Sequence, residues 1–155
     1  MITLALDLAG KTGYAIRYED GSAKAGTWNL VRGELGGARS PVPMVRLWKR
    51  LVRLSQDHEI DWIIYEETFG RGAAKFRLDS LQYTALLFAM LNGIGWSRVS
   101  PTAWKKAVVG DARAKRDEYH HFARSRWPEL NLFTDDQAAA MCLLAYGEQD
   151  GYRSG

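Results

Sequence analysis

The first third of the chain alternates between short apolar runs and turn residues. Residues 2–7 form a mostly apolar run that ends in an acid, residues 12–18 alternate apolar and polar side chains, and residues 23–30 follow a Glu-Asp-Gly turn. Short apolar or alternating runs separated by turn residues are typical of strands, and short connections favour antiparallel pairing. The pattern therefore predicts three strands in an antiparallel meander, followed by a glycine-rich loop over residues 31–40.

The remainder of the chain alternates helical and strand-like segments. The hydrophobic spacing predicts strands near residues 60–65 and 96–99, and helices near residues 41–58, 78–91, 102–109, 115–127 and 135–146. The first of these helices is expected to bury an apolar face that includes Val45, Leu47 and Leu51. A loop is expected between residues 66 and 77, and Asp135 or Asp136 is expected to cap the last helix. This order predicts an α/β fold, with a mixed five-stranded sheet and helices on both faces, in a single domain over residues 1–155.

The composition is typical of a globular protein, with 46% hydrophobic and 25% charged residues. The longest apolar run, residues 138–146, is much shorter than the roughly 20 residues of a membrane-spanning helix. No secretory signal is expected. The single cysteine, Cys142, has no partner for an internal disulfide, which favours a reducing cytoplasm.

Basic residues gather in two segments, and the net charge is +3. Seven basic residues face three acidic ones between Lys105 and Arg126, and a second cluster consists of Arg71, Lys75 and Arg77. One interpretation is an ordinary solvated surface. The other is contact with the phosphates of a nucleic acid.

Acidic residues occur at three places that this fold would bring together. Asp7 ends the first strand, Glu66 and Glu67 end the fourth, and Asp135 and Asp136 begin the last helix. The carboxyl ends of strands are where sites gather in open α/β sheets, and converging carboxylates need a cation between them. Two Mg²⁺ ions about 4 Å apart would support cleavage of a phosphodiester. The alternative interpretation is that each acid only caps or ends an element.

Four segments, in order, resemble the motifs of the RuvC-type Holliday junction resolvases. They are ALDLAGKTGYAI, IIYEETF, SPTAWKKAVVGDARAKRDE and TDDQAAAMCLLAYG, and together they span nearly the whole chain. The resemblance implies a ribonuclease H-like fold and a homodimer that resolves four-way DNA junctions by paired symmetric nicks. It implies that Mg²⁺ or Mn²⁺ is the cofactor, with two ions at each site. The chain is therefore expected to be a nuclease of a bacterium or a phage, acting in DNA recombination and repair.

The resemblance also assigns roles to individual residues. It implies Asp7, Glu66, Asp136 and Lys115 as catalytic residues, and the metal ligands are expected to be Asp7, Glu66, Asp136 and Asp135. Candidate DNA contacts are Phe69, Arg71, Lys75, Arg77, Lys105, Lys106, Arg113 and Lys115. Phe69 would act as a wedge or stacking residue, or else belong to the core. The helix over residues 78–91 is expected to be either the dimer face or simply core.

One position departs from the family pattern. The family has a second aspartate one helical turn after the position of Asp136, and this chain has Ala139 there. Either Asp135 or Glu67 takes its place, or the site has lost an acid. We hypothesise that Ala139 is an inactivating Asp→Ala substitution.

Other functions are compatible with the same motifs. A non-catalytic protein that binds branched DNA would keep the basic surface, and Ala139 keeps that alternative open. A ribonuclease H-like nuclease for another substrate, such as an RNA–DNA hybrid, would have the same metal site. An actin-like nucleotide-binding protein ranks last, because 155 residues do not provide the second domain that encloses a nucleotide.

Overall fold

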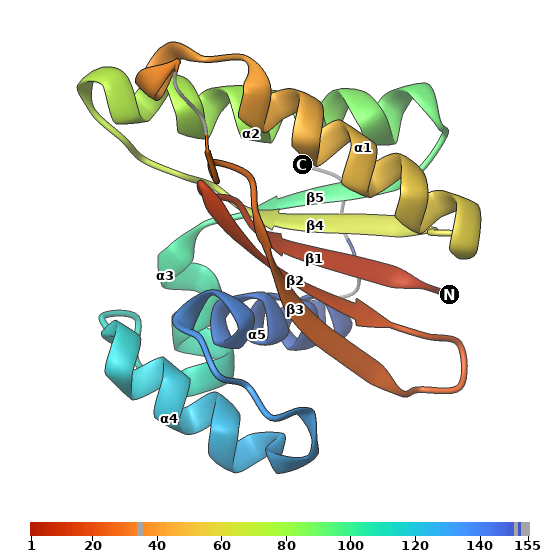
Figure 1. Ribbon diagram of the computed structural model, residues 1–155. Helices are drawn as coiled ribbons and strands as arrows, with labels where there is room; N and C mark the ends of the chain where they lie inside the picture. Colours follow the sequence, from red (N-terminus) through yellow and green to blue (C-terminus); the bar gives the residue numbers. More distant parts are fainter. Residues whose placement is uncertain (34–35, 151, 153–155) are drawn as a thin grey trace.

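The computed structural model describes residues 1–33, 36–150 and 152, and its centre is a five-stranded sheet with the order β3-β2-β1-β4-β5 (Figure 1). The strands are β1 (Thr3–Asp7), β2 (Lys11–Arg17), β3 (Ala23–Asn29), β4 (Trp62–Glu66) and β5 (Gly95–Val99). β1, β2 and β3 pair antiparallel, whereas β4 pairs parallel with both β1 and β5. The predicted meander and the mixed sheet are confirmed.

Helices cover both faces of this sheet, as predicted. α1 (Val42–Asp57) and α2 (Gly72–Leu91) lie on one face, and α5 (Asp135–Asp150) lies on the other (Figure 1). α4 (Arg116–Arg126) packs against α5, and α3 (Pro101–Trp104) continues into a π-helical segment, Lys105–Val109. Short 3-10 segments are Gly37–Arg39 and Pro128–Leu130. Among the described residues, no helix is long and apolar enough to cross a membrane.

The central strands are apolar because they are covered on both sides. Leu4 and Leu6 of β1 belong to the cluster under α1 and α2, and Ala5 between them faces α5. The stretch from Ala138 to Ala145 of α5 is buried throughout, with each residue at most 9% exposed. A helix that is apolar all round, like a strand without alternation, is expected where neighbours surround it.

The start of α2 differs from the prediction. The helix begins at Gly72 and not near Leu78, so the second half of the expected loop is helical. Ala73 and Ala74 favour helix, and Lys75 forms an i,i+4 ion pair with Asp79 at 2.5 Å. These local stabilising terms outweigh the glycines from which the loop was predicted.

The buried face of α1 also differs in one position. Leu47 and Leu51 are fully buried, as predicted, but Val45 is 51% exposed and lies outside the core. Pro43 is buried in its place, because Pro43, Leu47 and Leu51 are spaced four residues apart and so lie on the same side of the helix.

Gly13 of β2 allows an unusually close approach between the sheet and α5. It lies opposite Asp7 in the β1–β2 register, and a Cβ atom there would be 2.0 Å from the backbone oxygen of Asp136. Only glycine leaves this volume free. The start of α5 therefore rests directly on the strand beside Asp7.

We expect Gly13→Ala to force β2 and α5 apart. Overpacking of this kind typically costs about 1–3 kcal/mol, and the free energy of unfolding should fall by that amount. Urea denaturation monitored by tryptophan fluorescence measures the change. An unchanged free energy of unfolding would show that α5 does not depend on this contact.

Candidate active site

Asp7 is placed by a turn that the first motif builds. The Thr12 hydroxyl donates to the Ala9 carbonyl oxygen at 2.7 Å and accepts from the Ala9 amide at 3.3 Å. The Gly10 carbonyl oxygen accepts from the Leu30 amide at 2.8 Å, which fastens the turn to the end of β3. Thr12 is fully buried, so these bonds are shielded from water. The Asp7 carboxylate therefore projects from a fixed piece of backbone.

Glu66 ends β4, the parallel neighbour of β1, so its carboxylate emerges at the same edge of the sheet as that of Asp7. The indole nitrogen of Trp104 donates to Glu66 Oε2 at 2.5 Å. Trp104 is 1% exposed and lies in α3, immediately after β5. Its ring thus holds one oxygen of Glu66 in place from within the core.

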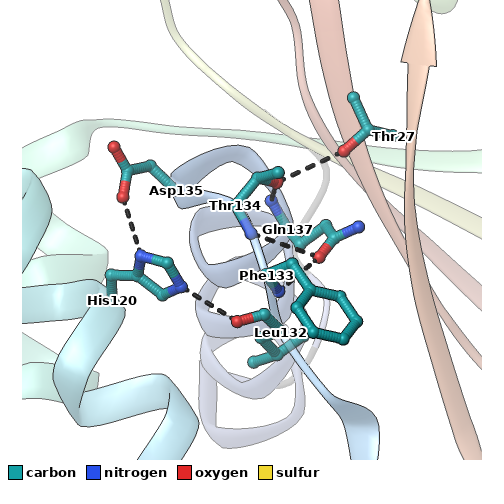
Figure 2. Close-up of polar contacts among 7 residues, drawn as sticks. All are labelled: Thr27, His120, Leu132, Phe133, Thr134, Asp135 and Gln137. Carbon is teal, nitrogen blue, oxygen red and sulfur yellow. Dashed lines mark hydrogen bonds and ion pairs between the residues drawn. The ribbon is translucent and has the colours of Figure 1, made fainter.

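Asp136 lies in the first turn of α5, and the residue that caps this helix is Thr134 (Figure 2). Thr134 Oγ1 accepts from the Gln137 amide at 3.2 Å, and Gln137 Oε1 accepts from the Thr134 amide at 3.4 Å. This reciprocal pair is a capping box. The prediction that Asp135 or Asp136 caps α5 is therefore wrong, and the Asp136 side chain is left for another role.

The three acids meet at one cavity of about 550 Å³. Asp7, Glu66 and Asp136 line it together with Ala139, which is one helical turn beyond Asp136. Four basic side chains share the lining: Lys105, Arg113, Lys115 and Arg116. The Lys105 ammonium is held over the rings of Trp104 and Tyr119, at 5.6 and 5.5 Å from their centroids. Acidic and basic side chains that line the same cavity suit a phosphate group bound through a cation.

Burial and mutual repulsion keep these carboxyl groups from ionising easily. Burial raises the pKa of Asp7 well above its usual range, and the charges of Glu66 and Asp136 raise it further, against the lowering effect of Arg116 and Lys105. Burial also raises the pKa of Glu66, which the Trp104 hydrogen bond partly offsets. The pKa of Asp136 is raised by burial and by the adjacent Asp135. A bound cation would relieve this electrostatic cost.

The two acids considered as replacements for the missing aspartate lie outside the cavity lining. Asp135 Oδ1 is 2.9 Å from Nδ1 of His120, whose Nε2 is 2.9 Å from the Leu132 carbonyl oxygen (Figure 2). Glu67 is paired with Arg98 at 3.7 Å. Ala139, in contrast, lies in the lining, so an aspartate at this position would add a fourth carboxylate to the cavity.

The predicted DNA contacts fall into two groups. Lys105, Arg113 and Lys115 line the cavity, but Lys106 does not.

The group around the start of α2 lies apart from the cavity: Phe69, Arg71, Lys75 and Arg77. Two of these cations have partners within the chain, since Lys75 pairs with Asp79 and Arg77 donates to the Gly37 carbonyl oxygen at 2.9 Å. Phe69 is 76% exposed, so the expectation that it belongs to the core is wrong.

Three large side chains that line the cavity were not predicted as site residues from the sequence: Trp104, Arg116 and Tyr119. From the sequence, Trp104 is expected in the core, and it is buried there. Its indole nitrogen also donates a hydrogen bond to Glu66. Arg116 follows Lys115 in the basic segment, and its charge acts on both Asp7 and Asp136. The only indication in the sequence was that Arg116 directly follows another basic residue, Lys115.

The donor set suits a hard cation that keeps part of its hydration shell. Among the residues that the structure describes, no group of three or more histidine, cysteine, aspartate or glutamate side chains is close enough to hold an ion alone. Mg²⁺ is commonly bound by one or two carboxylates, with water and phosphate oxygens completing its octahedron. Two of the three carboxylates that line the cavity, those of Asp7, Glu66 and Asp136, would be enough for such a site.

Comparison with solved structures finds extensive similarity in fold. The RuvC of Thermus thermophilus in complex with a Holliday junction substrate matches with a TM-score of 0.72 and 15% identity, over 98% of both chains. A second structure of T. thermophilus RuvC matches with a TM-score of 0.68 and 17% identity, over 98% of both chains. Fowlpox virus resolvase, in complex with Holliday junction DNA, matches with a TM-score of 0.59 and 16% identity, over 96% of this chain and 98% of that one.

The similarity to known proteins is found in the structure and not in the sequence. No protein-family model matches the chain, and no curated protein is significantly similar in sequence. The two T. thermophilus RuvC structures nevertheless match 98% of this chain, so the likeness in fold extends over the sheet and its helices. The chain therefore has the ribonuclease H-like fold of the RuvC-type Holliday junction resolvases.

Proposed function

We propose that this protein is a structure-selective DNA endonuclease that uses a divalent metal, Mg²⁺ or Mn²⁺, to resolve four-way junctions by paired symmetric nicks. The observation that carries the proposal is the convergence of Asp7, Glu66 and Asp136 with four basic side chains on one cavity at the carboxyl ends of β1 and β4. Resolvases with the same fold were solved with Holliday junction DNA bound. The protein would act in DNA recombination and repair, in the cytoplasm of a bacterium or of a phage-infected host.

The chain's own residues divide the chemistry between binding and orientation. Asp7 and Glu66 would hold the metal ion, and Asp136 would orient its hydration shell or become a further ligand. When bound, the metal supplies a polarised water for attack and charge stabilisation for the leaving oxygen. Lys105, Lys115 and Arg116 would bind the scissile phosphate in the cavity, close to the acids. They would also offset the negative charge that develops on the phosphate.

For a site with a fourth carboxylate at position 139, two metal ions are proposed. With Ala139, the three carboxylates carry less negative charge, and Lys105 and Arg116 oppose part of it. A second ion would therefore bind this chain more weakly than it binds an Ala139→Asp variant.

A homodimer would supply the two sites that paired nicks require. The exposed face of α2 carries the large apolar residues Tyr83, Leu87, Met90 and Leu91, with between 52% and 69% of each side chain exposed. Apolar side chains at this spacing on one helix favour helix-to-helix contact between subunits. We therefore propose that α2 forms the dimer interface.

A second candidate function is binding of branched DNA without cleavage. Ala139 is the observation that favours it, because this residue lies in the cavity where the resemblance places a catalytic aspartate. The basic lining that would hold a phosphate is the same in both functions.

Asp7→Asn should stabilise the protein in the absence of metal. Because the pKa of Asp7 is raised in the folded state, ionisation of Asp7 costs stability as the pH rises above the ordinary aspartate range. The melting temperature in EDTA should be higher for the variant at neutral pH. The difference should vanish at acidic pH, where Asp7 of the unmodified chain is protonated in both the folded and the unfolded state. Added Mg²⁺ should stabilise only the unmodified chain. A variant that melts lower at neutral pH would contradict this electrostatic account.

Restoring the carboxylate at position 139 should restore cleavage. With Mg²⁺, Ala139→Asp should cut a synthetic four-way junction at paired positions, and Ala139→Asn, of the same size but uncharged, should not. Competition with linear duplex and with an RNA–DNA hybrid establishes the preferred substrate. Absence of cleavage by the aspartate variant, despite tight junction binding, would favour the non-catalytic function.

Leu87→Glu should dissociate the proposed dimer. A charge placed within the apolar face of α2 opposes burial of that face, so sedimentation should report a monomer. Phe133→Glu is the matched control, because Phe133 is 78% exposed and precedes α5 on the other side of the sheet. Equal effects of both substitutions, or none from either, would reject α2 as the interface.

A further inference from the structure

α1 carries a row of basic residues that neither the motifs nor the active-site cavity explains. Arg46, Lys49, Arg50 and Arg53 are spaced i, i+3, i+4 and i+7, which places them along one side of the helix. Leu47 and Leu51 are buried in the core, and Lys49, Arg50 and Arg53 are exposed. From residue 30 to residue 56 the sequence has six basic residues and one acidic one.

Arg46 fastens this row to the segment that follows β3. Its Nη1 atom donates to the carbonyl oxygens of Leu30 at 3.0 Å and of Arg32 at 2.8 Å. Together these residues line a cavity of about 390 Å³, whose basic members are Arg32, Arg46, Lys49, Arg50 and Arg53. We call these five residues the α1 basic surface.

The outer members of this surface are not committed to partners within the described part of the chain. Lys49, Arg50 and Arg53 form no salt bridge there, in contrast to Lys75, which is paired with Asp79. Unpaired cations at this density repel one another, and an anionic partner would relieve the repulsion. Their long side chains on a rigid helix can adjust to a row of charges.

The α1 basic surface begins at the edge of the sheet where Asp7 lies. Asn29, which lines its cavity, is opposite Lys11 in the β2–β3 register, and the Leu30 amide bonds to the turn that follows Asp7. α1 then runs away from that edge across the face of the sheet (Figure 1). Arg32 and Arg46 therefore lie at the end of the surface that is nearer to this end of the sheet, and Arg53 lies two helical turns further along α1.

We propose that the α1 basic surface binds the phosphate backbone of a duplex arm of the branched substrate. This inference rests on the proposed function, because it supposes that a junction occupies the active-site cavity. Charge complementarity favours duplex DNA, since the surface lacks the aromatic side chains that stack on unpaired bases. It would set how the arm leaves the site and would not read its sequence.

The salt dependence of junction binding tests this assignment. Each phosphate that a basic residue neutralises contributes about 0.9 to the slope of log affinity against log salt concentration. Arg50→Gln/Arg53→Gln should therefore reduce the slope by about 1.8 for a four-way junction with long arms, measured by fluorescence anisotropy in EDTA. Glutamine keeps the helix propensity of arginine, and circular dichroism checks that the fold is retained.

The control is Lys24→Gln/Arg98→Gln, which removes the same charge elsewhere. Lys24 lies toward the end of β3 that is remote from Asn29, and Arg98 lies in β5, at the opposite edge of the sheet. A smaller slope in the α1 variant alone supports the inference. Equal changes in both variants would overturn it, because the effect would then be one of net charge. An unchanged slope in the α1 variant would also overturn it.

The same experiment separates this inference from the proposed function. Tight, salt-dependent binding with an unchanged slope in the α1 variant removes only the role of α1. Failure of the unmodified chain to prefer a junction over a linear duplex of equal length would contradict the proposed function, and the inference with it.

Discussion

The contact between Gly13 and the backbone of Asp136 is the constraint on which the site depends. Because β2 has no side chain at this point, the first turn of α5 lies directly on the strand that pairs with β1. Asp7 and Asp136 belong to elements far apart in the sequence, and this contact brings them to one cavity. Glu66 joins them because β4 is the parallel neighbour of β1. The packing of the backbone therefore brings the three carboxylates together, although their like charges repel one another.

Holding these acids together is electrostatically unfavourable, and the structure around them limits the cost. Trp104 donates to Glu66, and Lys105 and Arg116 lower the pKa of Asp7 against the effect of burial. The cations that line the cavity thereby stabilise the free protein, in addition to the phosphate binding that we propose for them. Arrangements that cost stability and persist in a rigid core are typical of functional sites. The α1 basic surface adds a second group of cations, on the face of the sheet opposite α5 (Figure 1).

The sheet and the acids of the site could be predicted from the sequence. The side chains that hold those acids in place could not. Apolar runs that end at Asp7 and Glu66 have a direct signal, because buried strands must be apolar along their whole length. The Thr134 cap was missed since Thr, Asp135 and Asp136 are all good capping residues, and only coordinates show which side chain meets Gln137. The role of Trp104 and the partners of Asp135 depend on contacts between distant segments. The basic row of α1 can be recognised in the sequence as Arg-x-x-Lys-Arg-x-x-Arg, but the contacts of Arg46 that bring it to the end of the sheet where Asp7 lies cannot.

The most direct test of this account is the position of a bound metal ion. A crystal of the chain with a four-way junction and Mn²⁺ would locate the ion by its anomalous scattering. The account predicts a peak in the cavity at the carboxyl ends of β1 and β4, in contact with the Asp7 and Glu66 carboxylates and with a phosphate oxygen of the junction. Junction bound with its backbone away from this cavity, or Mn²⁺ bound only at other carboxylates, would contradict it.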